Sequence, residues 1–187
     1  MKKILLALLS LSLTAGFWGC GKGDGFKDTG YELVYLTQAT TSGGISNEYA
    51  VPAGEGKYTY NFKVEDGKLK IIMTVLRSGS SEGKGFSVNV TPMVTETVAY
   101  IASGAVADGV LLPDGKYTLP TNVSVPSGKN FAAFYLEVEI PTIRDSAYDN
   151  KKLMLQVGIS NPTAYKLNDD LAYAIIVIDV KKMREKL

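Results

Sequence analysis

The position of one residue in this sequence predicts a specific chemical modification. Cys20 is the only cysteine of the chain, and it directly follows Gly19. A small residue before a lone cysteine fits the cleft of a lipoprotein signal peptidase, whereas a bulky side chain would not. The thiol then becomes the attachment point for acyl chains, and several chains anchor a protein far better than one. We therefore predict that Cys20 carries a lipid.

The segment before Cys20 has the pattern of an export signal. Lys2 and Lys3 precede an apolar run over residues 4–13. This run suits the core of a signal peptide and is too short to span a bilayer, which needs about 20 apolar residues. A plain signal peptide with an unrelated thiol and a buried apolar helix are the alternatives. The lone cysteine favours lipidation, because an exported protein would otherwise keep a reactive thiol without a partner.

Composition restricts the remaining chemistry. The chain has no histidine, which removes the commonest general base and the commonest metal ligand. Ser-His-Asp and Cys-His catalytic arrangements are therefore excluded, as are zinc sites built on His and Cys. Residues 79–85 are glycine-rich but lack the Gly-Lys-Ser/Thr ending of a phosphate-binding loop, so they predict a mobile loop. We expect no cofactor and no metal.

Paired carboxylates are the remaining route to catalysis, because two of them can hydrolyse a glycosidic bond. The candidate pairs are Glu137 with Glu139, Glu65 with Asp66, and Asp169 with Asp170. The first pair lies on the solvent side of a predicted strand, and the other two lie in turns. Residues 168–170 also lack the alternating oxygen ligands of a calcium loop. We predict no catalytic residue and a protein that is not an enzyme, with a carboxylate-dependent glycoside hydrolase as the less favoured alternative.

Aromatic side chains suggest a different role, because sugar rings stack on exposed aromatics. The chain has 11 tyrosines, most of them at predicted strand positions. Tyr100, Tyr148 and Tyr165 fall in or near predicted loops, where ligands commonly bind. The only tryptophan, Trp18, lies in the predicted signal, so the remaining chain lacks the side chain with the largest stacking surface. These three tyrosines are the candidates for ligand stacking.

Alternating apolar and polar residues predict strands along most of the chain. Asp66-Gly67 joins two such runs, which is the strongest short-range signal for a hairpin. Residues 171–180 are apolar on both faces, as in a central strand. The other predicted strands lie within residues 33–36, 58–64 (Tyr58, Tyr60, Phe62 and Val64), 69–76, 86–90, 134–140 and 153–159, and residues 96–102 predict one short helical turn. The pattern is typical of an all-β, immunoglobulin-like antiparallel sandwich of about seven strands.

The predicted organisation has four segments. They are a lipoprotein signal peptide (1–19), a flexible glycine-rich tether (20–30), the sandwich (31–180) and a solvated tail (181–187).

The net charge of the chain is close to zero. Lys and Arg number 20 and Asp and Glu 19, which gives a formal net charge of +1. Without clustered positive charge, we expect no nucleic-acid partner.

Several segments of the predicted sandwich have a distinctive sequence. They are Tyr-Glu-Leu-Val-Tyr-Leu at 31–36, Thr-Glu-Thr-Val-Ala-Tyr at 95–100, Leu-Pro-Asp-Gly-Lys-Tyr-Thr-Leu-Pro at 112–120, Val-Ser-Val-Pro-Ser-Gly at 123–128, and residues 148–159 and 173–180. Together they resemble a family of surface lipoproteins from Bacteroidetes. In that family an immunoglobulin-like domain of unknown function often precedes carbohydrate-active or glycan-binding modules. The resemblance implies an accessory of a polysaccharide-utilisation locus, beside glycan importers on the outer membrane. It carries over no catalytic residue.

These observations favour a non-catalytic accessory or binding module, lipid-anchored in the outer membrane and facing the cell surface rather than the periplasm. Its expected partners are the membrane, a glycan and neighbouring importer proteins. The chain ends soon after the predicted sandwich, which favours a stand-alone subunit. The alternative is a structural or adhesion component that acts through protein contacts, for example by strand addition at a sheet edge.

Residues 145–147 match a short Asp-Ser/Thr-apolar motif that these bacteria use for O-glycosylation of exported proteins. Ser146 is therefore a candidate modification site. An ordinary Asx turn is the alternative interpretation, because Asp side chains often bind the backbone two residues on.

Overall fold

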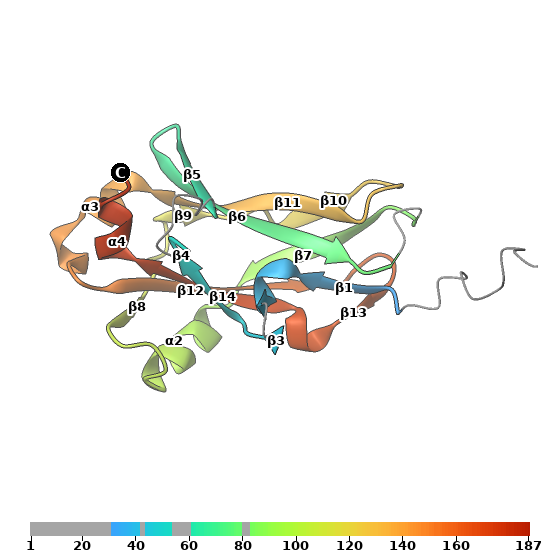
Figure 1. The fold of residues 1–187 in the computed structure, drawn as a ribbon, viewed down its shortest axis with the longest axis horizontal. Coiled ribbons are helices and arrows are strands. Elements are labelled where there is room, and N and C mark those ends of the chain that lie inside the picture. Colours follow the sequence, from blue (N-terminus) through green and yellow to red (C-terminus); the bar gives the residue numbers. More distant parts are fainter. Residues whose placement is uncertain (1–30, 42–43, 54–60, 80–82) are drawn as a thin grey trace, which may run out of the picture. The chain divides into compact units, whose positions relative to one another are not determined.

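Strands dominate the fold in a computed structural model that describes residues 31–41, 44–53, 61–79 and 83–187. The predictions for residues 1–19 and 20–30, including Cys20, and those for Tyr58 and Tyr60 lie outside the described residues. The described residues belong to one unit that runs from Tyr31 to Leu187. Within it, two sheets pack face to face (Figure 1).

The first sheet has the order β13-β1-β6-β11-β9, and β5 also pairs with β6. Its strands are β1 (Leu33–Leu36), β5 (Phe62–Glu65), β6 (Lys68–Arg77), β9 (Tyr117–Thr118), β11 (Phe131–Glu139) and β13 (Lys166–Leu167). The second sheet has the order β10-β7-β12-β14-β4, and β8 also pairs with β12. Its strands are β4 (Glu48–Val51), β7 (Phe86–Pro92), β8 (Gly109–Leu111), β10 (Asn122–Val125), β12 (Lys152–Ser160) and β14 (Tyr173–Asp179). A separate pair joins β2 (Thr40–Thr41) and β3 (Gly44–Ile45).

This strand order is that of an immunoglobulin-like sandwich, in which strands A, B, E and D form one sheet and G, F and C the other. Strands β1, β6, β11 and β9 take positions A, B, E and D, and β14, β12 and β7 take G, F and C. At the two edges of the second sheet, β10 pairs with β7, and β4 pairs in parallel with β14. The predicted all-β, immunoglobulin-like sandwich is therefore confirmed.

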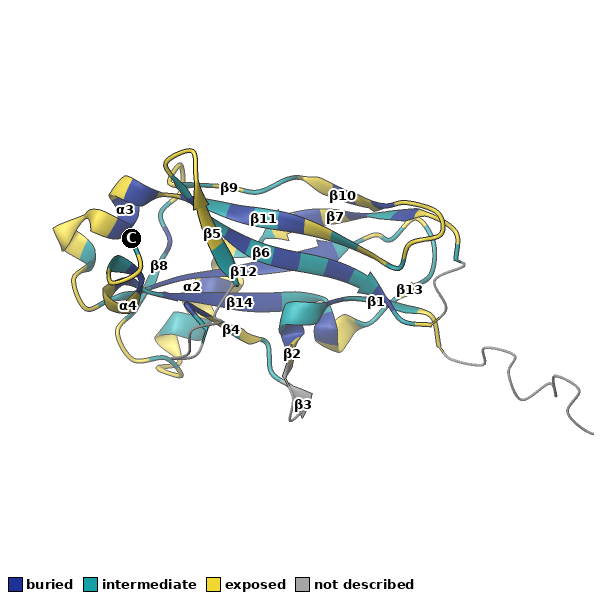
Figure 2. Cartoon of the chain, turned by 45° about the horizontal axis from the view of Figure 1, so that its top comes forward, coloured by how far each residue is buried: buried dark blue, intermediate teal, exposed yellow. Residues whose placement is uncertain are grey.

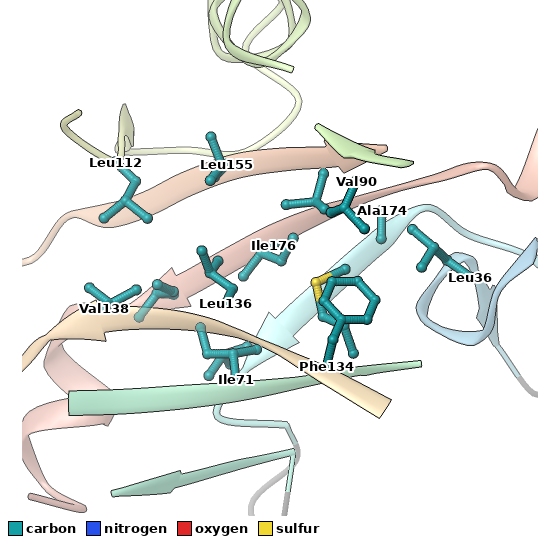
Figure 3. Packing of buried hydrophobic residues seen from close by; sticks show 14 of the residues in the cluster. Leu36, Ile71, Val90, Leu112, Phe134, Leu136, Val138, Leu155, Ala174 and Ile176 are labelled. Carbon is teal, nitrogen blue, oxygen red and sulfur yellow. The ribbon is translucent and has the colours of Figure 1, made fainter. Parts of the chain in front are cut away.

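One layer of apolar side chains fills the space between the sheets. Figure 3 shows Ile71 and Leu136 of the first sheet opposite Leu155 and Ile176 of the second. Every second residue of β6 is buried, as alternation predicts (Figure 2). Burial of one such side chain contributes about 1.5–3 kcal/mol. The chain has a single cysteine and so forms no internal disulfide, which leaves this core as the main source of stability.

The predicted Asp66-Gly67 hairpin is also confirmed. Both central residues have positive φ, 54° for Asp66 and 72° for Gly67. A tight hairpin requires this backbone conformation, because its twist then matches that of the flanking strands. The turn joins β5 and β6, which pair antiparallel from Glu65↔Lys68 onward.

Shorter elements differ from the prediction. The described residues form 14 strands rather than about seven, because strands of two to four residues are too short to show alternation. The predicted helical turn at 96–102 is a nine-residue helix, α2 (Val94–Ala102). The other helices are α3 (Ile140–Arg144), α4 (Val180–Arg184), η2 (Thr37–Ala39), η3 (Ser146–Tyr148) and η4 (Asp169–Leu171). None of these described helices has the length and apolar character needed to cross a membrane.

Residues 181–187 do not form the predicted solvated tail. Met183 of α4 is fully buried. The Arg184 guanidinium donates hydrogen bonds to the carbonyl oxygens of Ile143 and Asp145, each at 2.7 Å. The charged composition of the segment concealed two apolar side chains that pack inward, Met183 and Leu187, and two such residues give no periodicity to detect.

One edge of β6 is unpaired between its β5 and β1 partners, and a side chain from the other sheet forms a hydrogen bond there. Along one edge, β6 pairs with β5 up to Ile71 and with β1 from Val75. The Tyr49 hydroxyl of β4, which belongs to the other sheet, donates to the Ile72 carbonyl oxygen at 3.1 Å. Burial raises the pKa of Tyr49, so its hydroxyl remains a donor at neutral pH. This bond ties the edges of the two sheets together.

We expect Tyr49→Phe to lower the free energy of unfolding by about 1–3 kcal/mol, because the Ile72 carbonyl would lose its partner. Denaturant titration would measure the change. Tyr31→Phe is the matched control: Tyr31 is 86% exposed, and the same substitution there should change stability by less than about 0.5 kcal/mol. Equal stability of the two variants would contradict the role assigned to Tyr49.

Candidate functional site

Two adjacent pockets lie on the outer face of the second sheet, beside α2. We call them the Tyr173 pocket, of about 550 Å³, and the Asp179 pocket, of about 440 Å³. Strand β14 contributes residues to both, α2 and the following loop supply one wall, and β4 supplies the other. The Tyr173 pocket is lined by Glu48, Glu96, Tyr100, Gln156, Tyr173 and Ile175, among others. The Asp179 pocket is lined by Glu48, Ala50, Ala107, Lys152, Val177 and Asp179, among others.

Helix α2 is held against the sheet by apolar contacts and by one buried hydroxyl. The outward side chains of Ile175 and Val177 pack with Met154 against Tyr100 and Ile101, in a cluster separate from the core between the sheets. The walls of the pockets therefore rest on a second, smaller hydrophobic layer.

Thr97 supplies the buried hydroxyl and is fully buried itself. Its Oγ1 donates to the Met93 carbonyl oxygen at 2.7 Å and accepts from the Gln156 backbone N–H at 2.8 Å. The Met93 N–H in turn donates to the Gln156 carbonyl oxygen at 2.8 Å. These bonds fix the position of α2 over β12.

Gln156 places a buried amide at the Tyr173 pocket. The residue is only 6% exposed. Its Nε2 donates to the Met93 sulfur at 3.3 Å, and a thioether is a weak acceptor. No described residue donates a hydrogen bond to its Oε1. The Gln156 carboxamide can therefore accept a hydrogen bond from, or donate one to, a polar group that enters the pocket.

We call the two adjacent pockets together the groove. Tyr100 and Glu48 are in contact across it. The Tyr100 hydroxyl, from α2, donates a hydrogen bond to the Glu48 carboxylate on β4. Burial, followed by this bond to the carboxylate, raises the pKa of Tyr100 to about 12. Tyr100 is therefore a protonated donor throughout the neutral range. Glu48 lines both pockets, so the contact lies where they adjoin.

The structure brings one of the three predicted tyrosines to this site. Tyr100 lines the Tyr173 pocket, whereas Tyr148 packs against the core and lines neither pocket. Tyr165 meets the Phe86 ring edge-on at 5.5 Å and lies 4.9 Å from the Arg77 guanidinium, so it has a packing role. Sequence reasoning missed Tyr173, because a strand apolar on both faces does not reveal which face becomes a pocket.

The predicted carboxylate pairs lie elsewhere. Glu65 bonds Lys63 and Lys70, each at 2.8 Å, and these bonds lower the pKa of Glu65 to about 2. Glu137 pairs with Lys68 at 2.8 Å. None of these carboxylates lines the groove, nor do Glu139, Asp66, Asp169 or Asp170. Glu65 therefore stays ionised at neutral pH and is unsuited to act as a general acid.

Two carboxylates that the sequence did not pair line the Tyr173 pocket, Glu48 from β4 and Glu96 from α2. Carboxylates accept hydrogen bonds from hydroxyl groups, and tyrosine rings offer an apolar face with a polar edge. Within the described part of the chain, no group of three acidic, His or Cys side chains is placed to hold a metal ion. The arrangement is suited to bind a polyhydroxylated ligand.

Ser146 is exposed and begins η3. The Asp145 carboxylate accepts a hydrogen bond from the Ala147 N–H at 2.9 Å, which is the Asx turn named above as the alternative. The turn leaves the Ser146 side chain on the surface, and its glycosylation stays a prediction.

No family model matches the chain, and no curated protein matches it in sequence. Solved structures from Bacteroides ovatus share its fold. One is a candidate carbohydrate-binding protein, with TM-score 0.50 and 14% identity over 79% of this chain and 36% of that one. Two are proteins of unknown function, with TM-scores of 0.53 and 0.51 and identities of 15% and 16%; each match covers 79% of this chain, and 46% and 44% of theirs. This chain thus spans less than half of each of them, and such low identities establish the fold alone.

Replacement of the Thr97 hydroxyl tests the anchor of α2. Thr97→Val keeps the shape but removes the acceptor for the buried Gln156 N–H, so we expect the free energy of unfolding to fall by about 1–3 kcal/mol. Thr95→Val is the control, because Thr95 lies on the exposed side of the same helix. If both variants unfold at the same denaturant concentration, Thr97 does not anchor the helix.

Proposed function

We propose that this chain is a lipid-anchored, non-catalytic glycan-binding module of the outer membrane in a member of the Bacteroidetes. The observation that carries the proposal is the Tyr173 pocket, where one buried amide, two tyrosines and two carboxylates line the same cavity. Its volume of about 550 Å³ falls within the usual range for ligand sites, about 300–1,000 Å³.

The chemistry of the pocket suits a sugar. Sugar hydroxyls can donate to Glu48 and Glu96, while the Gln156 amide can both donate and accept. The rings of Tyr100 and Tyr173 provide surfaces for the apolar face of a pyranose. A ligand oxygen is also a stronger acceptor for the Gln156 Nε2 than the Met93 sulfur that it now contacts.

Binding without bond cleavage is the proposed activity. The chain has no histidine, and the predicted carboxylate pairs lie outside the groove. A glycosidase would require one groove carboxyl as a general acid and the other as a base or nucleophile. Glu48 already accepts the Tyr100 hydroxyl, and the remaining lone pairs of its carboxylate can accept hydrogen bonds from ligand hydroxyls.

The proposed location rests on the sequence before Tyr31. The apolar run and Cys20 support export and lipidation, and the resemblance to Bacteroidetes surface lipoproteins supports the outer membrane, the cell surface and a neighbouring glycan importer as partner. The shared fold with Bacteroides ovatus proteins agrees with this lineage.

Glycan binding can be tested by affinity electrophoresis of the purified full chain in gels that contain neutral polysaccharides, followed by calorimetry. Tyr173→Ala and Gln156→Met should each weaken binding about tenfold or more, which corresponds to about 1.4 kcal/mol. Tyr31→Ala, on an exposed residue outside the groove, should bind as the unsubstituted chain does. No new reducing ends should form during incubation.

Retention by none of the polysaccharides would reject the glycan-binding proposal. Release of reducing ends that Glu48→Gln or Glu96→Gln abolishes would replace it with a hydrolase. Binding that survives both Tyr173→Ala and Gln156→Met would place the site elsewhere.

For the anchor, we expect Cys20→Ser to abolish incorporation of radiolabelled palmitate and to release the protein from the membrane fraction, because serine cannot be processed and acylated in the same way. Ser146→Ala is the control and should keep both the label and the membrane association. Palmitate incorporation that persists in the Cys20→Ser protein would contradict lipidation at Cys20.

A further inference from the structure

The two pockets lie one after the other along strand β14. Outward-facing residues of β14 run from Tyr173 in the first pocket to Asp179 in the second, and Ser46 and Glu48 line both. Strand β4 pairs in parallel with β14, with Glu48 opposite Ile175 and Ala50 opposite Val177. One wall therefore continues from the first pocket to the second without interruption.

We propose that the two pockets are adjacent subsites of one groove, which binds a linear oligosaccharide along β14. This proposal rests on the proposed glycan-binding function and adds the form of the ligand. The distance from Tyr173 to Asp179 along an extended strand is about 20 Å, at a rise of about 3.3 Å per residue. A single sugar unit cannot occupy that length, whereas an oligomer can.

Glu48 links the subsites chemically. Its carboxylate accepts the Tyr100 hydroxyl and lines both pockets, so its remaining lone pairs can accept hydroxyl groups from sugar units on either side. A chain that runs past this residue keeps every unit within reach of a polar group.

The subsites differ in their hydrogen-bonding groups. The Tyr173 pocket has two carboxylates and no basic side chain among its lining residues. The Asp179 pocket includes Lys152 and Lys182, neither of which forms an ion pair with a described residue. Asp179 lies opposite Lys152 in register, but its Oδ1 accepts the Lys182 backbone N–H at 3.0 Å. The second subsite thus offers ammonium donors to the oxygens of the units that extend beyond Tyr100.

The experiment compares chain lengths. The full chain is titrated calorimetrically with cello-, malto-, xylo- and manno-oligosaccharides, each from disaccharide to hexasaccharide. For the series that binds, the hexasaccharide should bind about tenfold or more tightly than the disaccharide. The double variant Ala50→Leu/Ala107→Leu fills the Asp179 pocket and should reduce hexasaccharide affinity to the disaccharide level, while disaccharide affinity is unchanged.

The matched control is Ala102→Leu/Ala133→Leu, on two exposed alanines outside the groove, which should preserve the length dependence. Lys152→Ala is a second test that adds no bulk, and it should weaken only the longer ligands. Unfolding midpoints establish that each variant is folded.

The outcomes separate the two proposals. If disaccharides and hexasaccharides bind equally, or if the Asp179-pocket variants keep full hexasaccharide affinity, the second subsite is rejected and the Tyr173 pocket remains the glycan site. If no oligosaccharide of any length binds, the glycan-binding function itself is rejected.

Discussion

The constraint on which the site depends is that most of β12 and β14 is buried on both faces. Their inner side chains build the core of the sandwich, and their outer side chains would face water unless another element covered them. Helix α2 provides this cover through contacts with Met154, Ile175 and Val177. The nine-residue helix cannot cover the whole length of β14, and the uncovered stretch between α2 and β4 is the groove.

Polar groups at the edge of this apolar layer give the groove its chemistry. Thr97 and the backbone of Gln156 use their hydrogen bonds to hold α2 in place. The side chain of Gln156, in contrast, finds only a weak acceptor in the Met93 sulfur. Gln156 therefore has two roles. Its backbone holds α2 in place, and its side-chain amide faces the pocket, so the geometry of the site depends on the packing of α2.

The outer face of the first sheet has a different character. Lys63, Glu65 and Lys70 form an ion-paired network there, and Lys63 also lies 4.9 Å from the Tyr135 ring centroid. Exposed ion pairs of this kind contribute little to stability, but they keep a sheet face solvated. The sandwich thus has one solvated, ion-paired outer face and one that α2 partly covers. Among the described residues, the pockets of the covered face combine tyrosine rings with the Gln156 amide.

Much of the fold was predictable because its signals are local. Alternation identified β6 and β11, Asp66-Gly67 identified the hairpin, and the two apolar faces of residues 171–180 identified a central strand. These signals act between residues that are neighbours in the chain, so they are visible in the sequence. The exclusion of histidine chemistry follows from composition alone.

The site was decided by tertiary structure. Glu48 and Tyr100 are 52 residues apart, and Thr97 and Gln156 are 59 apart. Alternation reveals that a side chain points to one face of a sheet, but not which strand or helix will lie beside it. Tyr100 could be named as a candidate, whereas its meeting with Tyr173 and the buried amide of Gln156 required the packed sheets. The sequence by itself determined the longer strands, whose alternation is local, and only their packing determined which polar side chains face the same cavity.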